Sequence, residues 1–200
     1  MTVLTVIIPV YNETNTIVEI IDQILKIKIK KQIIVVDDCS TDGSKEKIIK
    51  YRRKISKIIF HKKNLGKGAA IQTARKYIKG KLVIIQDADL EYNPKDYKKL
   101  SKPILEKKSL VVYGSRVLGK NRYKTNDFTS LIRVFFNHIL TIISNFLNKQ
   151  RLTDAHTCYK VFDSKLFKKI KLKENGFAFC PEVTTKISKL KIGITEIPIS

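Results

Sequence analysis

The sequence predicts an α/β fold in which a mainly parallel sheet is covered by helices on both faces. Short runs of Ile and Val without polar alternation occur at residues 3–10, 33–36 and 83–85, as expected of strands buried on both faces. Segments with apolar residues at helical spacing separate these runs, which is typical of parallel strands joined by crossover helices. A chain of 200 residues can bury a sizeable core, so we expect one domain over residues 1–200.

The first two strands each lead into a predicted helix. Polar residues after the strand at 3–10 cap a helix whose apolar positions repeat at helical spacing over residues 17–25. The strand at 33–36 precedes a helix that begins at Thr41 or Asp42 and ends near Arg53. Both units therefore read as a strand followed by a crossover helix.

The next two strands follow the same alternation. Residues 58–60 form a short strand, and the glycine-bearing turn NLGKG at 64–68 leads into an Ala-rich helix. The strand at 83–85 ends at an acidic turn, after which Asn93 and Pro94 begin another helix.

The second half begins with a fifth strand at 110–113. Its most apolar segment, 128–147, contains Arg133 and other polar residues and is too polar to cross a membrane comfortably. Two interpretations stay open, a helix packed on the domain and an amphipathic helix in the membrane interface. A short helix at 163–170, a helix that Pro181 begins and a last strand at 192–199 complete the chain.

The composition indicates an anionic partner. The net charge of +22 and the pI of about 9.9 suit a nucleic acid, a membrane surface or a phosphorylated substrate. The basic residues form no nucleic-acid-binding motif, so we expect no nucleic-acid partner. Three widely spaced cysteines without a C-x-x-C pair indicate reduced thiols, and the sequence shows no signal peptide and no long apolar run. We therefore expect a cytoplasmic protein without a spanning helix.

Acidic residues follow the predicted strands where a ligand would bind. Open parallel sheets bind ligands beyond the carboxyl ends of their strands. Asp38 follows the second strand, and Asp87, Asp89 and Glu91 follow the fourth. The spacing of the last three would turn three carboxylates toward one Mg²⁺ or Mn²⁺ ion, the kind of ion that holds nucleotide phosphates. The alternative is an acidic turn that caps the next helix. Tyr11, after the first strand, can pack on a base.

Two other nucleotide or acid-site folds are disfavoured. A dinucleotide-binding Rossmann site needs G-x-G-x-x-G after a strand, whereas the first turn here reads PVYNET. A receiver domain also places acids at strand ends, but the NLGKGAA turn and the long second half argue against it.

The motifs PVYNE, VVDDCSTDGS, NLGKGAA, QDADLEYNP and YGSR, in this order and spacing, resemble family 2 glycosyltransferases with the GT-A fold. They are most similar to the dolichol-phosphate mannose synthase-like branch. The resemblance implies an inverting, metal-dependent hexosyltransferase that moves a sugar from a GDP- or UDP-linked donor to a polyprenyl phosphate, dolichyl or undecaprenyl. It implies a nucleotide-sugar-binding half at 1–114 and an acceptor half at 115–200.

The resemblance also implies residue roles. Asp87 and Asp89 would hold Mg²⁺ or Mn²⁺, with Glu91 where relatives often carry Gln. Arg116 would bind the acceptor phosphate, with Arg133 as a second ligand, and the catalytic residues would be Asp89, Arg116 and Asp154. Asp154 stays open between an active-site carboxylate and a turn acid. The residues implied for the nucleotide sugar are Pro9, Tyr11, Glu13, Val36, Asp38, Lys67, Asp87, Ala88 and Asp89.

Alternatives to this function are transfer to a glycan or glycolipid hydroxyl, which would need a base such as Asp154, and an inactive nucleotide-binding homologue. The apolar segment and the basic charge lead us to expect peripheral association with the cytoplasmic face of an anionic membrane, with a membrane-protein partner as a further expectation. In the branch, a loop of Tyr, Gly, Arg, Ser and Lys residues follows the last strand and closes over the donor. We expect slow transfer from these 200 residues without it.

Overall fold

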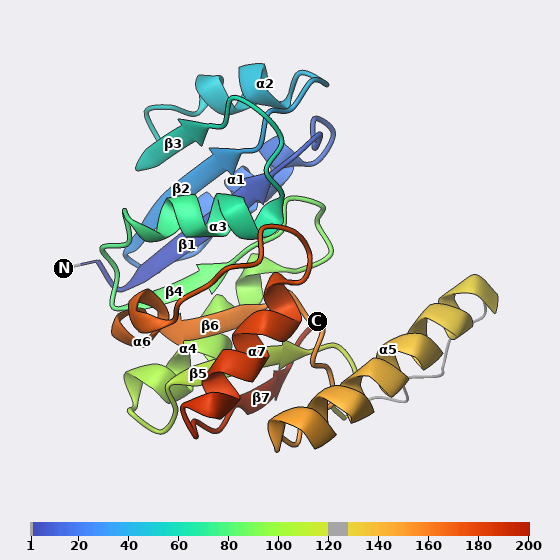
Figure 1. The fold of residues 1–200 in the computed structure, drawn as a ribbon. Coiled ribbons are helices and arrows are strands. Elements are labelled where there is room, and N and C mark those ends of the chain that lie inside the picture. Colours follow the sequence, from blue (N-terminus) through green and yellow to red (C-terminus); the bar gives the residue numbers. More distant parts are fainter. Residues whose placement is uncertain (1, 120–127) are drawn as a thin grey trace.

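A computed structural model describes residues 2–119 and 128–200, and Figure 1 shows their arrangement. The described residues form a seven-stranded sheet in the order β3-β2-β1-β4-β6-β5-β7, with helices packed on its faces. The strands are β1 Leu4–Val10, β2 Lys31–Asp37, β3 Lys57–Phe60, β4 Leu82–Ile85, β5 Val111–Ser115, β6 Lys160–Asp163 and β7 Thr195–Pro198. The helices are α1 Ile17–Lys26, α2 Ser44–Lys50, α3 Lys67–Arg75, α4 Tyr97–Leu105, α5 Phe128–Asn148, α6 Ser164–Lys169 and α7 Phe179–Lys189, with a 3-10 turn, η1, at Pro94–Asp96.

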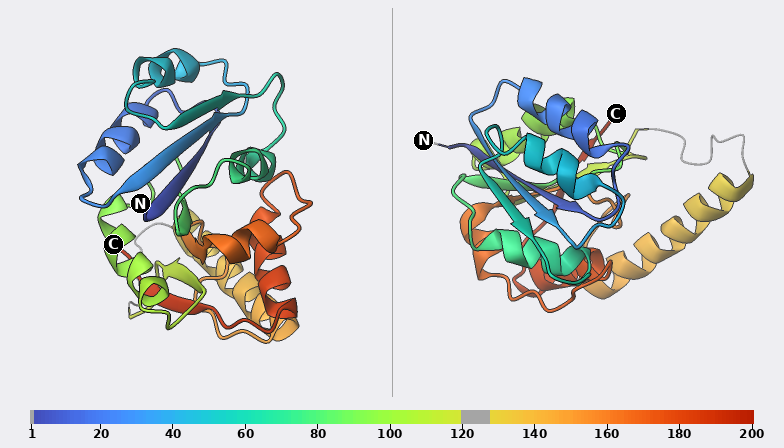
Figure 2. Two further views of the ribbon diagram at one scale, coloured as in Figure 1. Left: turned by 90° about the vertical axis from the view of Figure 1, so that its left-hand side faces the viewer. Right: turned by 90° about the horizontal axis from the view of Figure 1, so that it is seen from above.

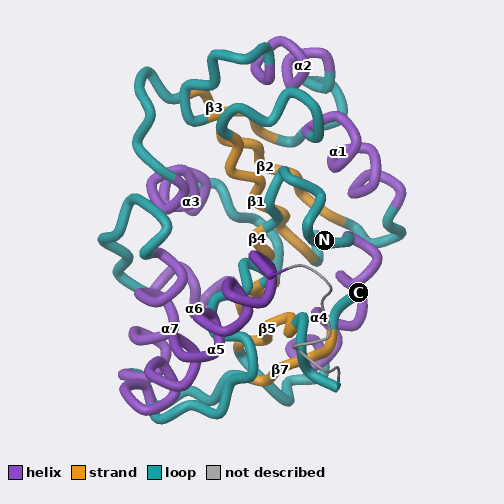
Figure 3. Tube along the Cα trace, turned by 90° about the vertical axis from the view of Figure 1, so that its right-hand side faces the viewer, coloured by secondary structure: helices purple, strands orange, loops and turns teal. Residues whose placement is uncertain are grey.

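The predicted parallel half is confirmed. Strand β1 pairs in parallel with β2 on one side and with β4 on the other, so that Ile7 lies beside Ile34 and Ile85. Alternate side chains of β1 enter two separate cores because successive residues of a strand point to opposite faces. Val6 and Ile8 pack under α1 and α4, and Ile7 packs under α3. Figure 3 shows α1 and α4 on one side of the sheet and α3, α6 and α7 on the other.

One strand was not predicted. Strand β6 runs antiparallel between β4 and β5, with Phe162 beside Val83 on one strand and Val111 on the other. The strand could not be recognised in the sequence because its first residue, Lys160, is a lysine at a fully buried position and interrupts the apolar pattern. The Lys160 ammonium donates to the Ala155 carbonyl at 3.1 Å and lies 3.6 Å from the centre of the Tyr113 ring. The sheet is therefore mixed but mainly parallel.

Helix α5 projects from the domain (Figures 1 and 2), and its large apolar side chains are exposed. Its C-terminal end lies beside α7, where Ser188 donates a hydrogen bond to the Asn148 carbonyl. Polar residues make the contacts with the domain: Thr141 and Asn148 are buried, and Asn145 pairs with the backbone of Leu152 through both its amide atoms. The exposed apolar residues of this helix are Ile132, Phe135, Phe136, Ile139, Leu140, Ile142, Ile143, Phe146 and Leu147.

The polarity of α5 is thus the reverse of that of a surface helix in a globular protein, which turns its apolar stripe to the core. Because the helix runs apart from the sheet for most of its length, the interpretation of a helix packed on the domain is wrong for its apolar face. Among the described residues, no helix has a stretch long and apolar enough to cross a bilayer.

Candidate functional site

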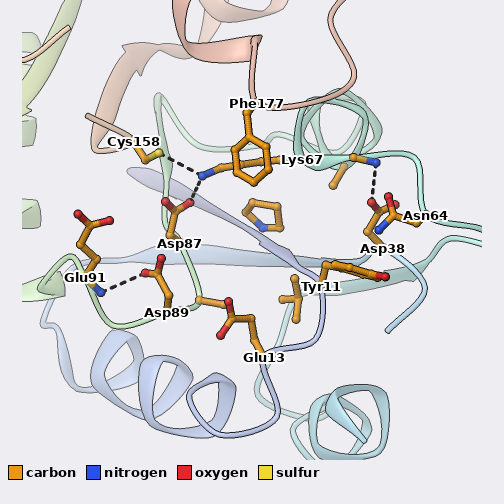
Figure 4. A pocket seen from close by; sticks show the side chains of 15 residues that line it. Tyr11, Glu13, Asp38, Asn64, Lys67, Asp87, Asp89, Glu91, Cys158 and Phe177 are labelled. Atoms are coloured by element: carbon orange, nitrogen blue, oxygen red, sulfur yellow. Dashed lines mark hydrogen bonds and ion pairs between the residues drawn. The ribbon is translucent and has the colours of Figure 1, made fainter. Parts of the chain in front are cut away.

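A cavity of about 460 Å³ lies beyond the carboxyl ends of β1, β2 and β4, against the N-terminus of α3 (Figure 4). This is the edge at which parallel sheets bind ligands. Two of its lining residues, Cys158 and Phe177, come from the second half of the chain. The full lining is Pro9, Val10, Tyr11, Glu13, Asp38, Asn64, Gly66, Lys67, Ala70, Asp87, Ala88, Asp89, Glu91, Cys158 and Phe177.

The predicted nucleotide-sugar residues meet at this cavity, with one exception. The Tyr11 side chain is 48% exposed, so its ring is available to a ligand. Glu13 lines the same wall, and its carboxylate accepts from the Thr16 hydroxyl at 2.7 Å. Val36 does not line the cavity as expected, because its side chain is fully buried in the core below α3. Val36 is the second-to-last residue of β2, and its side chain packs in the core beneath α3 instead of at the cavity.

Asp38 closes one end of the cavity. Its carboxylate accepts from the backbone amides of Leu65, at 3.0 and 3.1 Å, and Gly66, at 2.6 Å, and so fixes the turn that enters α3. His61, a residue that the sequence interpretation missed, lies with Nδ1 2.6 Å from Asp38 Oδ1. Part of the acceptor capacity that we expected Asp38 to offer a base is therefore used within the protein.

Glycines let a second loop approach the start of α3. A Cβ on Gly68 would lie 2.2 Å from the Glu174 carbonyl oxygen, and one on Gly66 would lie 2.5 Å from that of Asn175. The same loop is held by Ala69 N, which donates to Asn175 O at 3.0 Å. Phe177, the next aromatic residue of this loop, is 84% exposed and lines the cavity (Figure 4). No signal in the sequence distinguished this Phe from the buried ones.

At the other end of the cavity, Lys67 forms an ion pair with Asp87 and a 3.1 Å contact with the Cys158 sulfur. Burial alone would lower the pKa of Lys67, but the Asp87 carboxylate and the Cys158 sulfur together outweigh burial and raise that pKa above its usual value. Lys67 is therefore a fixed cation at the cavity wall. The sequence placed Lys67 at the diphosphate side but did not pair it with Asp87.

The three carboxylates after β4 do not converge as predicted. Asp89 is exposed and accepts from the Glu91 amide at 3.1 Å, an Asx turn. The Glu91 carboxylate instead forms an ion pair with Arg116, with Oε1 2.5 Å from Nη1. The described residues contain no group of three acidic, His or Cys side chains arranged to hold a metal ion. The expectation of Glu91 as a third convergent ligand is thus wrong for this structure, and Asp87 and Asp89 remain.

Arg116 is held from two sides. Its Nε lies 2.8 Å and its Nη2 3.1 Å from the Asp154 carboxylate, opposite the Glu91 contact. Burial would raise the pKa of Asp154, but hydrogen bonds from Arg116 outweigh burial and lower it. Glu196, missed in the sequence, accepts from the Thr153 and Asp154 amides at 2.6 and 2.9 Å and fixes this turn. The Arg133 side chain lies outside the described residues.

The whole fold is that of known nucleotide-sugar enzymes. The structure of glucosyl-3-phosphoglycerate synthase from Mycobacterium tuberculosis with Mn²⁺, UDP and glucosyl-3-phosphoglycerate superposes with a TM-score of 0.75 at 18% identity, over 99% of this chain and 70% of that one. The fold and the position of the cavity therefore define the chain as a domain of the GT-A class, as predicted.

The chain belongs to glycosyl transferase family 2, whose sequence profile matches residues 5–171. It is 31% identical over 200 residues to an uncharacterized protein of Methanocaldococcus jannaschii, covering 97% of this chain and 79% of the relative. It is 27% identical over 219 residues to a dolichyl-phosphate beta-glucosyltransferase of Trichomonas vaginalis, covering 98% of this chain and 64% of the relative. The prediction of a family 2 glycosyltransferase is confirmed.

Proposed function

We propose that the chain transfers a hexosyl group from a nucleoside diphosphate sugar to a polyprenyl phosphate. The observation that carries the proposal is the cavity itself, which joins an aromatic and acceptor end at Tyr11 and Asp38 to a charged end at Lys67, Asp87 and Asp89. A nucleotide sugar has the same division into a flat base and an anionic diphosphate. The similarity to dolichyl-phosphate glycosyltransferases supports the acceptor class.

A divalent Mg²⁺ or Mn²⁺ ion fits the charged end. Asp87 and Asp89 supply carboxylate oxygens, the donors that these ions prefer. Mg²⁺ in phosphate-transfer sites usually takes one or two protein carboxylates and completes its shell with substrate phosphates. When bound, the ion would neutralise the charge that develops on the departing diphosphate. Lys67 adds a second cation at the same wall.

The acceptor phosphate would meet Arg116. The Glu91–Arg116 pair is partly exposed, with side chains 48% and 33% accessible, whereas the Asp154 side chain is 7% accessible. An incoming phosphate can therefore replace Glu91 at one edge of the guanidinium while Asp154 keeps hold of the other. The planar fork of Arg suits this geometry.

Phosphate chemistry also removes the need for a strong base. The acceptor oxygen is already anionic at neutral pH, so in-line attack on the anomeric carbon depends on positioning. The single displacement inverts the sugar carbon. Transfer to a hydroxyl would instead need a base, and Asp154 is unsuited to that role because both its oxygens bind Arg116 and its pKa is lowered.

The apolar face of α5 supports peripheral association with the cytoplasmic face of an anionic membrane. Burying one large apolar side chain stabilises a protein by about 1.5–3 kcal/mol, and the exposed side chains of α5 would regain this free energy in contact with lipid. The net charge of +22 adds attraction to anionic headgroups. A lipid-linked acceptor would be met at the same surface, and an apolar membrane-protein partner could share the face.

A direct assay tests the function. The full chain, with Mn²⁺ and polyprenyl phosphate, is incubated with a panel of UDP- and GDP-linked sugars and the lipid fraction is scored for new sugar–phosphate linkages. We expect one donor to give a β-linked lipid product from an α-linked donor. Product on a free hydroxyl acceptor but not on the lipid phosphate would overturn the acceptor assignment.

A further inference from the structure

Three polar side chains, one buried and two partly buried, form a hydrogen-bonded series beside the end of the cavity at Asp38. Asp38 follows β2, His61 follows β3, and Thr73 lies within α3. His61 Nδ1 is 2.6 Å from Asp38 Oδ1, and His61 Nε2 is 3.0 Å from the Thr73 hydroxyl. The side chains of His61 and Asp38 are 7% and 4% accessible. The two contacts of His61 thus connect the ends of β2 and β3 with α3, the three elements that surround this end of the cavity.

The donor and acceptor roles follow from the chemistry of Asp38. An aspartate carboxylate only accepts hydrogen bonds, and two backbone amides, Leu65 N and Gly66 N, donate to this one. His61 Nδ1 must therefore carry the proton that it shares with Asp38. In the neutral ring Nε2 is then an acceptor, and the Thr73 hydroxyl donates to it. Thr73 thereby selects the tautomer that serves Asp38.

The acceptor count leaves Asp38 with room for a ligand. A carboxylate has about four lone-pair positions. Three N–H donors reach this carboxylate, from His61, Leu65 and Gly66, and the Leu65 N–H is shared between both oxygens, so a fourth donor can take one of the two positions that this N–H spans. Asp38 also lines the cavity. One acceptor direction is thus left for a donor group that enters from the cavity.

We propose that His61 is a positioning residue of the donor site, holding the Asp38 carboxylate so that its remaining lone pair receives a ring N–H of the donor nucleobase. Uracil and guanine carry such an N–H. The proposal rests on the proposed function, since it assumes that a nucleoside diphosphate enters this cavity. His61 does not touch the ligand; it acts through Asp38.

Two matched substitutions separate this role from a purely structural one. In His61→Asn the amide nitrogen takes the place of Nδ1 and can still donate to Asp38, whereas the contact with Thr73 is lost. In His61→Gln the longer amide reaches toward Thr73 but leaves Asp38 without its donor. Isothermal titration of each full-length variant with UDP and GDP in Mn²⁺, and with pyrophosphate in Mn²⁺, gives the comparison.

We expect His61→Gln to weaken binding of the preferred nucleoside diphosphate by about tenfold or more, the size of a lost hydrogen bond to a charged group. Binding of pyrophosphate should stay within about twofold, and His61→Asn should stay near the parent for both ligands. Equal losses in the two variants, or a parallel loss of pyrophosphate binding, would overturn the inference. If the parent bound pyrophosphate but no nucleoside diphosphate, the proposed function itself would fail.

A measurement on the unsubstituted protein guards against variants that do not fold. The ring ¹⁵N spectrum should show His61 protonated at Nδ1, and UDP or GDP should shift the Nδ1 signal while pyrophosphate does not. A ring protonated at Nε2, or equal shifts with pyrophosphate, would contradict the positioning role.

Discussion

The guanidinium of Arg116 and the carboxylate of Asp154 form a two-point contact, with Nε 2.8 Å from Oδ2 and Nη2 3.1 Å from Oδ1. Asp154 follows α5 in the chain and Arg116 follows β5, so two distant segments fix this cation next to Glu91, which lines the cavity. This contact favours our proposal that Asp154 supports Arg116, over the alternative that it acts as a general base.

Asp154→Asn should destabilise the fold by about 3 kcal/mol, since it leaves Arg116 with only its partly exposed partner. The folded-state pKa of Asp154 is lowered, so its contribution to stability is fully present above the unfolded pKa of about 3.9 and is lost as pH falls through the folded pKa. Urea unfolding at pH values from 7 to 2 should therefore show that the free energy of unfolding falls less steeply with acid in the variant than in the parent. An equally steep fall in both proteins would contradict this account.

Arg116→Lys should affect the acceptor more than the donor. Lysine keeps the charge but cannot hold Asp154 with two nitrogens and offer a third to a phosphate. We expect the KM for polyprenyl phosphate to rise at least tenfold, while the affinity for the nucleotide changes by less than about twofold. Steady-state kinetics with each substrate varied in turn gives both numbers. A selective loss of nucleotide affinity would place Arg116 at the donor instead.

Asp89→Asn should weaken metal-dependent nucleotide binding by at least the roughly 10- to 100-fold that loss of an outer-shell partner costs a metal site. Asp89 is exposed, so the melting temperature should hardly change. Titration with UDP or GDP, with Mn²⁺ and then with EDTA, measures the effect. Glu91→Gln is the matched control, because Glu91 faces Arg116, and it should spare metal-dependent binding. Undiminished sugar transfer in the presence of EDTA would contradict the proposed role of a metal ion.

Phe177→Ala should lower the affinity for the donor without a change in stability. The ring is 84% exposed, so its removal costs the fold almost nothing, yet it lies at the cavity on a loop anchored to α3. We expect a loss of about three- to tenfold in affinity, as for a lost aromatic contact. Phe177→Tyr should restore it. Comparison of UDP with UDP-hexose assigns the contact to the nucleotide or to the sugar, and equal affinities for all variants would show that Phe177 has no part in binding.

The double substitution Phe135→Ser with Phe146→Ser should reduce flotation with anionic liposomes while leaving the unfolding transition unchanged. Both rings are more than half exposed on α5. Leu105→Ser, at an apolar site on α4 that is 49% exposed against 51% for Phe135, is the control and should float like the parent. Binding should also weaken with salt, at about 1 kcal/mol per basic residue near the surface. Equal binding to neutral and anionic vesicles would exclude a role for charge.

The strands and helices of the first half could be predicted because each is specified locally. Runs of Val and Ile make β1, β2 and β4, and Asn93 caps the next turn by accepting from Lys95 N at 3.0 Å. The position of the cavity could also be predicted, because the carboxyl ends of parallel strands lie at one edge of the sheet. The hydrogen-bond and ion-pair partners of the side chains could not be predicted. The pairing of Glu91 with Arg116 depends on where β5 lies in the sheet. The contact of His61 with Asp38 depends on β3 lying beside β2.

The insertion of β6 between β4 and β5 sets the order in which the molecule can assemble. Strands β1 to β4 can pair as they leave the ribosome, but within the described residues β5 pairs with β6 and β7 alone, and both come later in the chain. In the interval, α5 has emerged with its apolar face uncovered. The nascent chain thus presents a helix with an uncovered apolar face before the sheet is complete, so that contact with a bilayer or a chaperone during synthesis would precede the pairing of the last strands.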